Sequence, residues 1–172
     1  MKTCKHCQAE FQPARPMQSV CSPICAAQKV KADRKAEKAE LKRRKLSVLT
    51  RSDWMKKAQV SFNAYIRARD RDLPCISCGT TSQTVQYHAG HYLSTGARPN
   101  LRFCETNVAK QCAQCNTHLS GNLISYRLEL INRVGLQEVE RLERDHVERR
   151  YTIDGLQEIV RQYREFTKEL LK

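Results

Sequence analysis

The sequence predicts an α+β protein made of small modules and helices. Three observations predict this class: eight of the nine cysteines form four close pairs, short strand-like runs lie between two of those pairs, and helix-forming stretches flank them. A chain of 172 residues suits one modest domain with extensions, or two small modules. No apolar run reaches about 18 residues, and the first residues lack the apolar core of a signal peptide. We therefore expect a cytoplasmic protein of a reducing compartment, without membrane contact.

The paired cysteines indicate metal ligands rather than disulfides, because a reducing compartment keeps thiols free. Three pairs have the spacing C-x2-C and one has C-x3-C. Such a turn points two thiolates at one centre, and two turns complete a tetrahedral zinc site. A disulfide framework is the alternative. The ninth cysteine, Cys104, has no partner at this spacing and is expected to be a small buried strand residue. Two structural Zn²⁺ sites follow, one from Cys4, Cys7, Cys21 and Cys25 and one from Cys75, Cys78, Cys112 and Cys115.

The charge of the chain favours a polyanionic partner. Thirty-one Lys and Arg against 18 Asp and Glu give a formal charge of +13, and nucleic acid is the commonest polyanion. Residues 29–57 hold twelve Lys and Arg against four Asp and Glu, a net charge of +8. Within them, residues 26–46 are rich in Ala, Lys, Glu and Arg without an apolar stripe, which predicts a long exposed helix. This helix either lies along phosphates or is a solvated spacer. Its candidate DNA contacts are Lys42, Arg43, Arg44 and Lys45.

More helices are predicted on both sides of the later cysteines. One begins at the cap-like Ser52 and carries a packing stripe at helical spacing. Residues 122–172 have ten basic and ten acidic residues, and we expect this neutral region to pack on its own core or on a copy of itself. Gly135 would end its first helix, residues 136–150 would form a second helix with His146 on its surface, and Thr152 would cap a third. The stripe of the earlier helix consists of Trp54, Ala58, Phe62, Tyr65 and Ile66.

Two histidines lie between the last two cysteine pairs, in the sequence "YHAGHYLSTG". The order there is a strand-like run "TVQYH", a Gly-rich loop, a second run "NLRF", and then a helix. His88 and His91 are three residues apart, and along a straight strand such positions point to opposite faces. We therefore expect Gly90 and Gly96 to allow a tight turn that brings both rings to one side.

A phosphodiester-hydrolysing site is predicted from these residues. Asn116 follows Cys115, so a zinc ion would fix its amide near the end of the first strand. Asn116 and His88 would hold a catalytic divalent ion, Mg²⁺ or Mn²⁺, which keeps positions for water and phosphate oxygens. His91 would be the general base, because a neutral imidazole with a pKa near about 6.5 accepts a proton at physiological pH.

Four further polar residues belong to the candidate site. Asn107 is grouped with the catalytic residues, where it is expected to hydrogen-bond the loop that holds His91 rather than to bind metal. Arg98 and Arg102 flank the loop and are either phosphate ligands or surface charges. His118 either reaches a phosphate or lies on a helix surface.

The stretch of residues 75–122 resembles the HNH branch of the ββα-metal (His-Me finger) nucleases, in the variant framed by a four-cysteine zinc. The resemblance implies that His91 is the catalytic His at the end of the first strand. It also implies that Asn107 is the middle Asn and that Asn116 is the last metal ligand. That last residue is often His in the family, but Asn stands here, as in the T-even phage resolvase endonuclease VII. The resolvase has a metal-binding acid where this sequence has His88.

The whole chain resembles the NinG, or Rap, recombination proteins of lambdoid phages. The similar features include "CKHCQAEF", the basic helix, "AGHY", "RPNLRF", "QCAQCN" and "SGN". The resemblance implies a structure-specific endonuclease acting on branched DNA, including Holliday junctions and D-loops, in a bacterial host cell, with other phage recombination proteins as further partners. Many relatives carry Asp at the position of His88.

Together these inferences predict a small zinc-stabilised ββα-metal core at residues 51–122. An N-terminal four-cysteine zinc module (1–28) and a basic helical linker (29–50) would precede it, and a C-terminal helical region (123–172) would follow. A metal-dependent junction endonuclease is the favoured function. The alternatives are a non-catalytic DNA-binding zinc protein, such as a transcriptional or recombination accessory factor, and an RNA-binding or RNA-cleaving protein. A homodimer would suit the paired strands of a junction.

Overall fold

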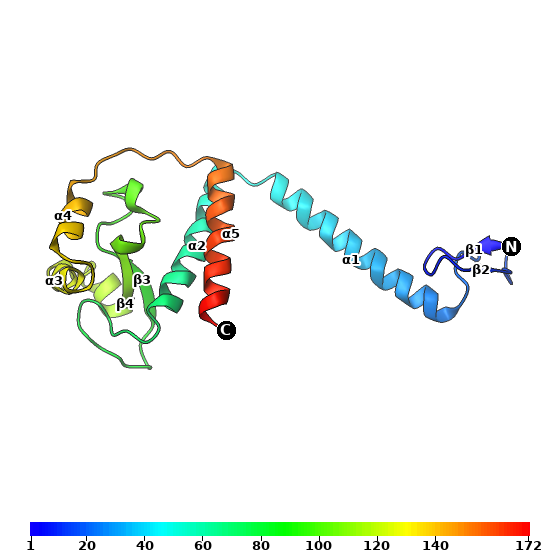
Figure 1. Ribbon diagram of the computed structural model, residues 1–172, viewed down its shortest axis with the longest axis horizontal. Coiled ribbons are helices and arrows are strands. Elements are labelled where there is room, and N and C mark those ends of the chain that lie inside the picture. Colours follow the sequence, from blue (N-terminus) through cyan, green and yellow to red (C-terminus); the bar gives the residue numbers. More distant parts are fainter. The chain divides into compact units, whose positions relative to one another are not determined.

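A computed structural model describes all residues, 1–172 (Figure 1). The chain divides into two units, residues 1–49 and residues 50–172. The first unit combines the predicted zinc module with nearly all of the predicted linker. The second combines the predicted core with the C-terminal helices. None of the helices has both the length and the apolar character that a membrane crossing requires.

The first unit consists of a small hairpin and one long helix. Strand β1 (Lys2–Thr3) pairs antiparallel with strand β2 (Glu10–Phe11). Helix α1 (Pro23–Ser47) follows, and the side chain of Ser22 caps its start by accepting a hydrogen bond from the backbone N–H of Cys25 at 3.2 Å. The long helix predicted over residues 26–46 is therefore confirmed.

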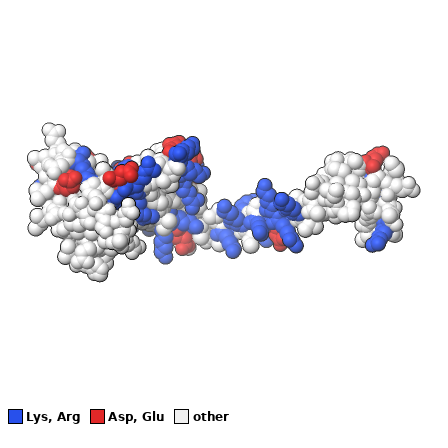
Figure 2. Space-filling model, turned by 90° about the horizontal axis from the view of Figure 1, so that it is seen from below, with Lys and Arg blue, Asp and Glu red and all other residues white.

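Helix α1 has no buried apolar face. Cys25 is its only buried residue, and residues 42–45 are all exposed. Arg43 and Arg44 both form ion pairs with Glu40, at 2.9 and 3.0 Å, and their hydrogen bonds lower the pKa of that carboxyl. Lys and Arg side chains cover much of the helix on the face seen in Figure 2.

Helix α2 (Arg51–Arg69) opens the second unit. Its cap is Thr50, so the prediction that Ser52 begins the helix is wrong. The Thr50 hydroxyl accepts from the Asp53 backbone N–H at 3.2 Å, and the Asp53 carboxylate accepts from the Thr50 backbone N–H at 3.0 Å. This reciprocal pair of hydrogen bonds needs an acidic residue three positions after the cap. Thr50 has Asp53 at that position, whereas Ser52 has no acidic residue there. The predicted stripe is confirmed, with Trp54, Ala58, Phe62 and Ile66 buried and Tyr65 half-buried.

The sheet of this unit has two antiparallel strands, β3 (Tyr87–His91) and β4 (Val108–Cys112). The prediction of a second strand at "NLRF" is wrong, because Pro99–Leu101 form a 3₁₀ turn instead. All five residues of β4 are buried. A strand buried on both faces has no alternation of polar and apolar residues, so the pattern that marks most strands is missing there.

A buried ion pair fixes the end of α2 to β4. Asp70 is 2% exposed, and its carboxylate accepts two hydrogen bonds from Arg69 and one from the backbone N–H of Lys110 at 2.9 Å. Arg69 also donates to the carbonyl of Val108 at 2.8 Å. These contacts satisfy the buried charges and fix α2 relative to the strand that leads to the last cysteine pair.

Three helices complete the unit: α3 (Leu123–Val134), α4 (Leu136–Arg144) and α5 (Ile153–Leu170). Gly135 separates the first two with a φ of 84°, a left-handed conformation that favours glycine. Thr152 caps α5, as predicted. Helix α5 lies alongside α2, so the expectation that this neutral region packs on its own core is confirmed (Figure 1).

The helix predicted over residues 136–150 ends at Arg144. Residues 145–152, called the strap below, lead from α4 to α5 without helical structure. His146 therefore lies in the strap rather than on a helix surface. The Asp145 side chain accepts from the backbone N–H of Val147 at 3.1 Å, a local hydrogen bond that competes with helix continuation.

The sheet lies between two helical layers. Helices α2 and α5 are on one side, and α3 and α4 are on the other (Figure 1). Ala89 and Val108 pack with Phe62 in the first layer, whereas Ala109 packs with Tyr126 in the second. Successive residues of each strand thus face different layers, which decides where each polar side chain of the candidate site points.

Candidate metal centres and an adjoining polar site

The first cysteine cluster joins the hairpin of β1 and β2 to the start of α1. The sulfur atoms of its four cysteines all lie within 4.8 Å of one another. Cys7 Sγ is 3.6 Å from Cys21 Sγ, which is 3.5 Å from Cys25 Sγ. The backbone N–H of Cys21 donates to Cys4 Sγ at 3.3 Å, and backbone hydrogen bonds around it lower the pKa of Cys4 to about 6. A lowered pKa favours the thiolate, the form that binds metal. Hydrogen bonds with Cys25 and Cys7 act in the opposite direction on Cys21 and raise its pKa to about 12.

The second cluster joins the segment before β3 to the end of β4. Its four sulfur atoms also lie within 4.8 Å of one another, and Cys78 Sγ is 3.8 Å from Cys112 Sγ. Gly79 follows with a φ of 72°, which lets the chain turn back after the second thiol. Burial acts to raise the pKa of Cys75, but backbone N–H groups, led by that of Cys112, lower it to about 7.

Both clusters suit zinc rather than disulfides. All nine cysteines are free, and the sulfur separations far exceed the S–S bond of about 2.05 Å. A tetrahedral zinc site with Zn–S bonds of about 2.3 Å places its sulfurs about 3.8 Å apart, close to the separations of 3.5–3.8 Å found here. Each cluster could therefore bind one zinc ion, as predicted.

Cys104 lies outside both clusters, as predicted, but not in a strand. It precedes the 3₁₀ turn Glu105–Asn107 and is half-buried, with its sulfur 3.3 Å from the Thr106 hydroxyl. The prediction of a buried strand residue is wrong because the second strand begins only at Val108.

His88 and Asn116 are brought together from different elements. His88 is in β3, and Asn116 is in the π-helical turn Gln114–His118, directly after Cys115 of the second cluster. The Asn116 amide nitrogen is 3.0 Å from His88 Nδ1. The cysteine cluster thus holds an amide and an imidazole in contact, at the place where the sequence predicted the two ion ligands.

Gly90 is next to this pair and allows its close packing. A methyl group at Gly90 would lie 2.2 Å from Gln111 Oε1 and 3.1 Å from Asn116 Oδ1. Gln111 is fully buried, and its amide nitrogen donates to the Ser77 hydroxyl at 2.7 Å and the Gly121 carbonyl at 2.6 Å. Its Oε1 is buried next to Gly90 without a hydrogen-bond partner.

Gly90→Ala is expected to destabilise the second unit and to separate Asn116 from His88. The added methyl must displace the buried Gln111 side chain, and overpacking of this kind costs about 1–3 kcal/mol. Denaturant unfolding followed by circular dichroism would measure the loss. Gly96→Ala is the matched control, because a methyl there has nothing nearer than Ser94 Oγ at 3.9 Å. Equal stabilities of the two variants would contradict the packing described for Gly90.

His91 is the last residue of β3 and has a defined tautomer. Its Nε2 is 3.0 Å from the carbonyl oxygen of Arg102. Since a carbonyl only accepts, Nε2 carries the hydrogen and Nδ1 keeps the lone pair. Burial lowers the pKa of His91 below its ordinary value; the hydrogen bond to the Arg102 carbonyl opposes this shift, and the Arg102 charge adds to it. The ring is therefore neutral at physiological pH, with its basic nitrogen free of this hydrogen bond.

The prediction that a turn brings His88 and His91 to one side is wrong. Strand β3 pairs with β4 at every residue, from Tyr87 opposite Cys112 to His91 opposite Val108. A turn would lose these ladder hydrogen bonds. In the unbroken strand His88 faces Asn116, while His91 lies on the face of Ala89, toward α2. The two rings therefore approach from opposite faces of one strand.

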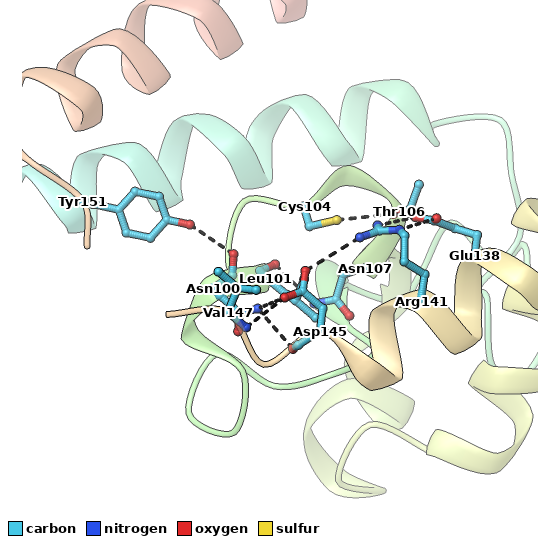
Figure 3. A network of polar contacts seen from close by, with 10 residues as sticks. All are labelled: Asn100, Leu101, Cys104, Thr106, Asn107, Glu138, Arg141, Asp145, Val147 and Tyr151. Atoms are coloured by element: carbon cyan, nitrogen blue, oxygen red, sulfur yellow. Dashed lines mark hydrogen bonds and ion pairs between the residues drawn. The ribbon is translucent and has the colours of Figure 1, made fainter. Parts of the chain in front are cut away.

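Asn107 clamps the loop that connects the two strands. It is fully buried; its Oδ1 accepts from the backbone N–H of Leu93 at 2.9 Å, and its Nδ2 donates to the carbonyls of Leu93 and Leu101 at 3.0 and 3.3 Å. Figure 3 shows its place beside Leu101. These bonds fix the connecting loop (residues 92–107), which presents the Arg102 carbonyl to His91, and they agree with the role expected for Asn107.

The other candidate phosphate ligands have different partners. The half-buried Arg102 donates to the Gln59 side chain of α2 at 3.1 Å. Arg98 contacts His146 of the strap at 3.1 Å. His118 is exposed at the end of the π-helical turn and makes no side-chain hydrogen bond. The basic residues 42–45 belong to the other unit.

The comparisons with known proteins place the chain in a phage family. It matches the family described as "Bacteriophage Lambda NinG protein" over residues 1–172. The chain belongs to the NinG family. The "Protein ninG" chains of Escherichia phage lambda and Escherichia phage 933W are both 44% identical to it, over 98% of this chain and 93% of theirs. That of Enterobacteria phage H19B is 46% identical over 89% of this chain and 85% of its own.

The expected membership of the NinG family is thus confirmed, although the names of these relatives state no activity. No solved structure matches the chain. Sequence reasoning also missed two features of this NinG-family chain, the Gln111 side chain packed against Gly90 and the contact of Arg98 with His146. Strand register brings the first together and tertiary packing the second, so no local pattern marks either.

Proposed function

We propose that this NinG-family chain is a metal-dependent DNA endonuclease that hydrolyses phosphodiesters in branched DNA, such as Holliday junctions and D-loops. The observation that carries the proposal is the contact between the Asn116 amide nitrogen and His88 Nδ1, which lie 3.0 Å apart. His88 is on strand β3, which ends at the neutral His91. Two antiparallel strands followed by a helical turn and α3 also support an HNH-type ββα-metal core.

His88 and Asn116 would hold a divalent ion, Mg²⁺ or Mn²⁺. A half-turn of the Asn116 amide exchanges its nitrogen for its oxygen, so that the pair offers one nitrogen and one oxygen ligand. The bound ion would neutralise charge on the phosphate and on the leaving oxygen. The second cysteine cluster would hold Asn116 in position, because Cys115 of that cluster is its neighbour in the chain.

His91 would take the proton from the attacking water at Nδ1, while its Nε2–H donates to the Arg102 carbonyl and holds the ring. In an in-line displacement the attacking water and the leaving oxygen lie on opposite sides of phosphorus. A base and an ion on opposite faces of one strand suit that geometry. Strand β3 has a strand partner on one side only, so we place the scissile phosphate at its unpaired edge.

The charge of the chain suits a DNA substrate. The exposed basic residues of α1 and the formal charge of +13 would contribute phosphate contacts that are independent of sequence.

One observation favours a second candidate function, DNA binding without catalysis. The unit of residues 1–49 has a metal cluster and a basic helix but none of the residues of the proposed cleavage site.

A nicking assay with and without Mg²⁺ tests the proposal, using a four-way junction, a duplex of the same sequence and a single-stranded RNA as substrates. We expect Mg²⁺-dependent cleavage of the junction above that of the duplex. Binding of the junction without cleavage in either Mg²⁺ or Mn²⁺ would support the second candidate. Preferential cleavage of the RNA would reject a DNA substrate.

A further inference from the structure

A hollow of about 300 Å³ lies between the connecting loop and the strap. The loop contributes Arg98, and the strap contributes His146, Glu148, Arg149 and Arg150. All of these residues belong to the second unit. Three arginines against one glutamate leave the lining with a net charge of +2 when His146 is neutral.

The strap is fixed to the loop by a network of hydrogen bonds, which Figure 3 shows. The Asn100 amide donates to the Asp145 carboxylate at 2.9 Å and to its carbonyl at 3.2 Å. At the other end of the strap, the Tyr151 hydroxyl donates to the Asn100 carbonyl at 3.3 Å. One buried asparagine thus holds both ends of the strap, so the hollow has a defined wall.

The arginines of the hollow have no carboxylate partners. Arg98 donates to the Ala97 carbonyl at 3.2 Å and to His146 Nε2 at 3.1 Å, and its own Nε is buried without a partner. Arg149 and Arg150 are exposed and form no ion pair. Elsewhere in the second unit, Arg127, Arg133, Arg141, Arg144 and Arg161 pair with glutamates, whereas Arg51, Arg67, Arg102 and Arg164 form no ion pair and do not line the hollow.

We propose that this hollow binds a DNA backbone phosphate other than the one that is cut. A guanidinium offers parallel N–H donors that match phosphate oxygens, and three guanidinium groups without acid partners leave such donors unused. The inference rests on the proposed function. The proposed hollow adds a second phosphate contact on the connecting loop. The same loop holds His91, because its Arg102 carbonyl accepts a hydrogen bond from the His91 ring.

The position of the hollow favours DNA over a free anion. Arg98 and Arg102 are joined by one 3₁₀ turn, in which the Leu101 N–H donates to the Arg98 carbonyl at 3.1 Å. A phosphate held by Arg98 is therefore at a fixed place relative to the carbonyl that orients His91. Contacts of this kind fix the register of a nucleic acid on a protein.

The double variant Arg149→Gln/Arg150→Gln tests the inference. Binding of a fluorescent four-way junction to the full chain would be measured by anisotropy over a range of salt concentrations, without added divalent ion. The slope of log affinity against log salt is expected to flatten by about 0.9 for each phosphate that the variant no longer neutralises. Arg164→Gln/Lys168→Gln is the matched control, because it removes two exposed charges from α5 and should leave the slope unchanged.

Three results would overturn the inference. An unchanged slope, or equal flattening in the control, would mean that the hollow binds no DNA phosphate of its own. Calorimetric binding of inorganic phosphate that disappears in Arg149→Gln/Arg150→Gln, with an unchanged DNA slope, would assign the hollow to a free anion. Failure of the proposed function would look different. A chain that binds junctions through this hollow but never cleaves them would still show the flatter salt dependence of binding in Arg149→Gln/Arg150→Gln.

Discussion

His91→Ala is expected to leave the protein folded and bound to DNA while Mg²⁺-dependent junction cleavage falls about 10²–10⁴-fold. The imidazole is the only group that we assign to proton removal from water, and its loss leaves His88 and Asn116 in place. Single-turnover cleavage of a four-way junction measures the rate, and anisotropy measures binding. Cleavage at the normal rate by His91→Ala would exclude His91 as the base.

Variants of the two proposed metal ligands are expected to fail differently. His88→Ala or Asn116→Ala should lose activity that partly returns at high Mg²⁺ or Mn²⁺, because weakened ion binding is offset by concentration. His88→Asp should keep activity, since a carboxylate is a better ligand for a hard cation. A folded His88→Asp protein without activity would contradict the ligand assignment even if His91→Ala behaves as expected.

The pH dependence of cleavage gives a further check on His91. A general base acts in its neutral form, so the rate should fall as the pH drops through its pKa. Burial lowers the pKa of His91, and we therefore expect full activity to extend below the pH at which an exposed imidazole becomes protonated. An acid limb centred above about pH 6.5, the ordinary imidazole pKa, would contradict a buried base.

Cys78→Ser is expected to unfold the second unit, and Cys7→Ser is expected to leave that unit folded. A structural zinc site contributes folding free energy directly, about 10–16 kcal/mol in zinc-finger peptides, and removal of one thiolate forfeits much of it. Both residues are exposed, so the two substitutions differ mainly in the cluster that they disrupt. Elemental analysis would count zinc, and thermal unfolding would follow the helices of each variant.

Cys104→Ser supplies the control for removal of a thiol. Cys104 lies outside both clusters, so the variant protein should keep two zinc ions per chain. A Cys78→Ser protein with an unchanged melting curve would show that the second cluster does not stabilise the fold. One zinc or none in carefully purified wild-type protein would contradict the two-site prediction itself.

The sequence by itself determined what depends on local spacing. Cysteines two or three residues apart predicted both clusters, because a short turn is enough to point two thiols at one centre. Helix α1 followed from composition without an apolar stripe, and α2 from its stripe, since helical periodicity is a property of one segment. The position of Asn116 directly after Cys115 likewise predicted where its amide would lie.

Only the tertiary structure decided what depends on pairing between distant segments. Strand β4 is buried on both faces and carries no alternation, so its register became visible only in the paired sheet. The same pairing keeps β3 unbroken, which leaves His88 and His91 on opposite faces. Gln111 reaches the site through that same register. The strap is held against the connecting loop because Asp145 bonds to Asn100, 45 residues earlier in the chain. Such contacts form only when the two segments meet, and no window of the sequence contains both.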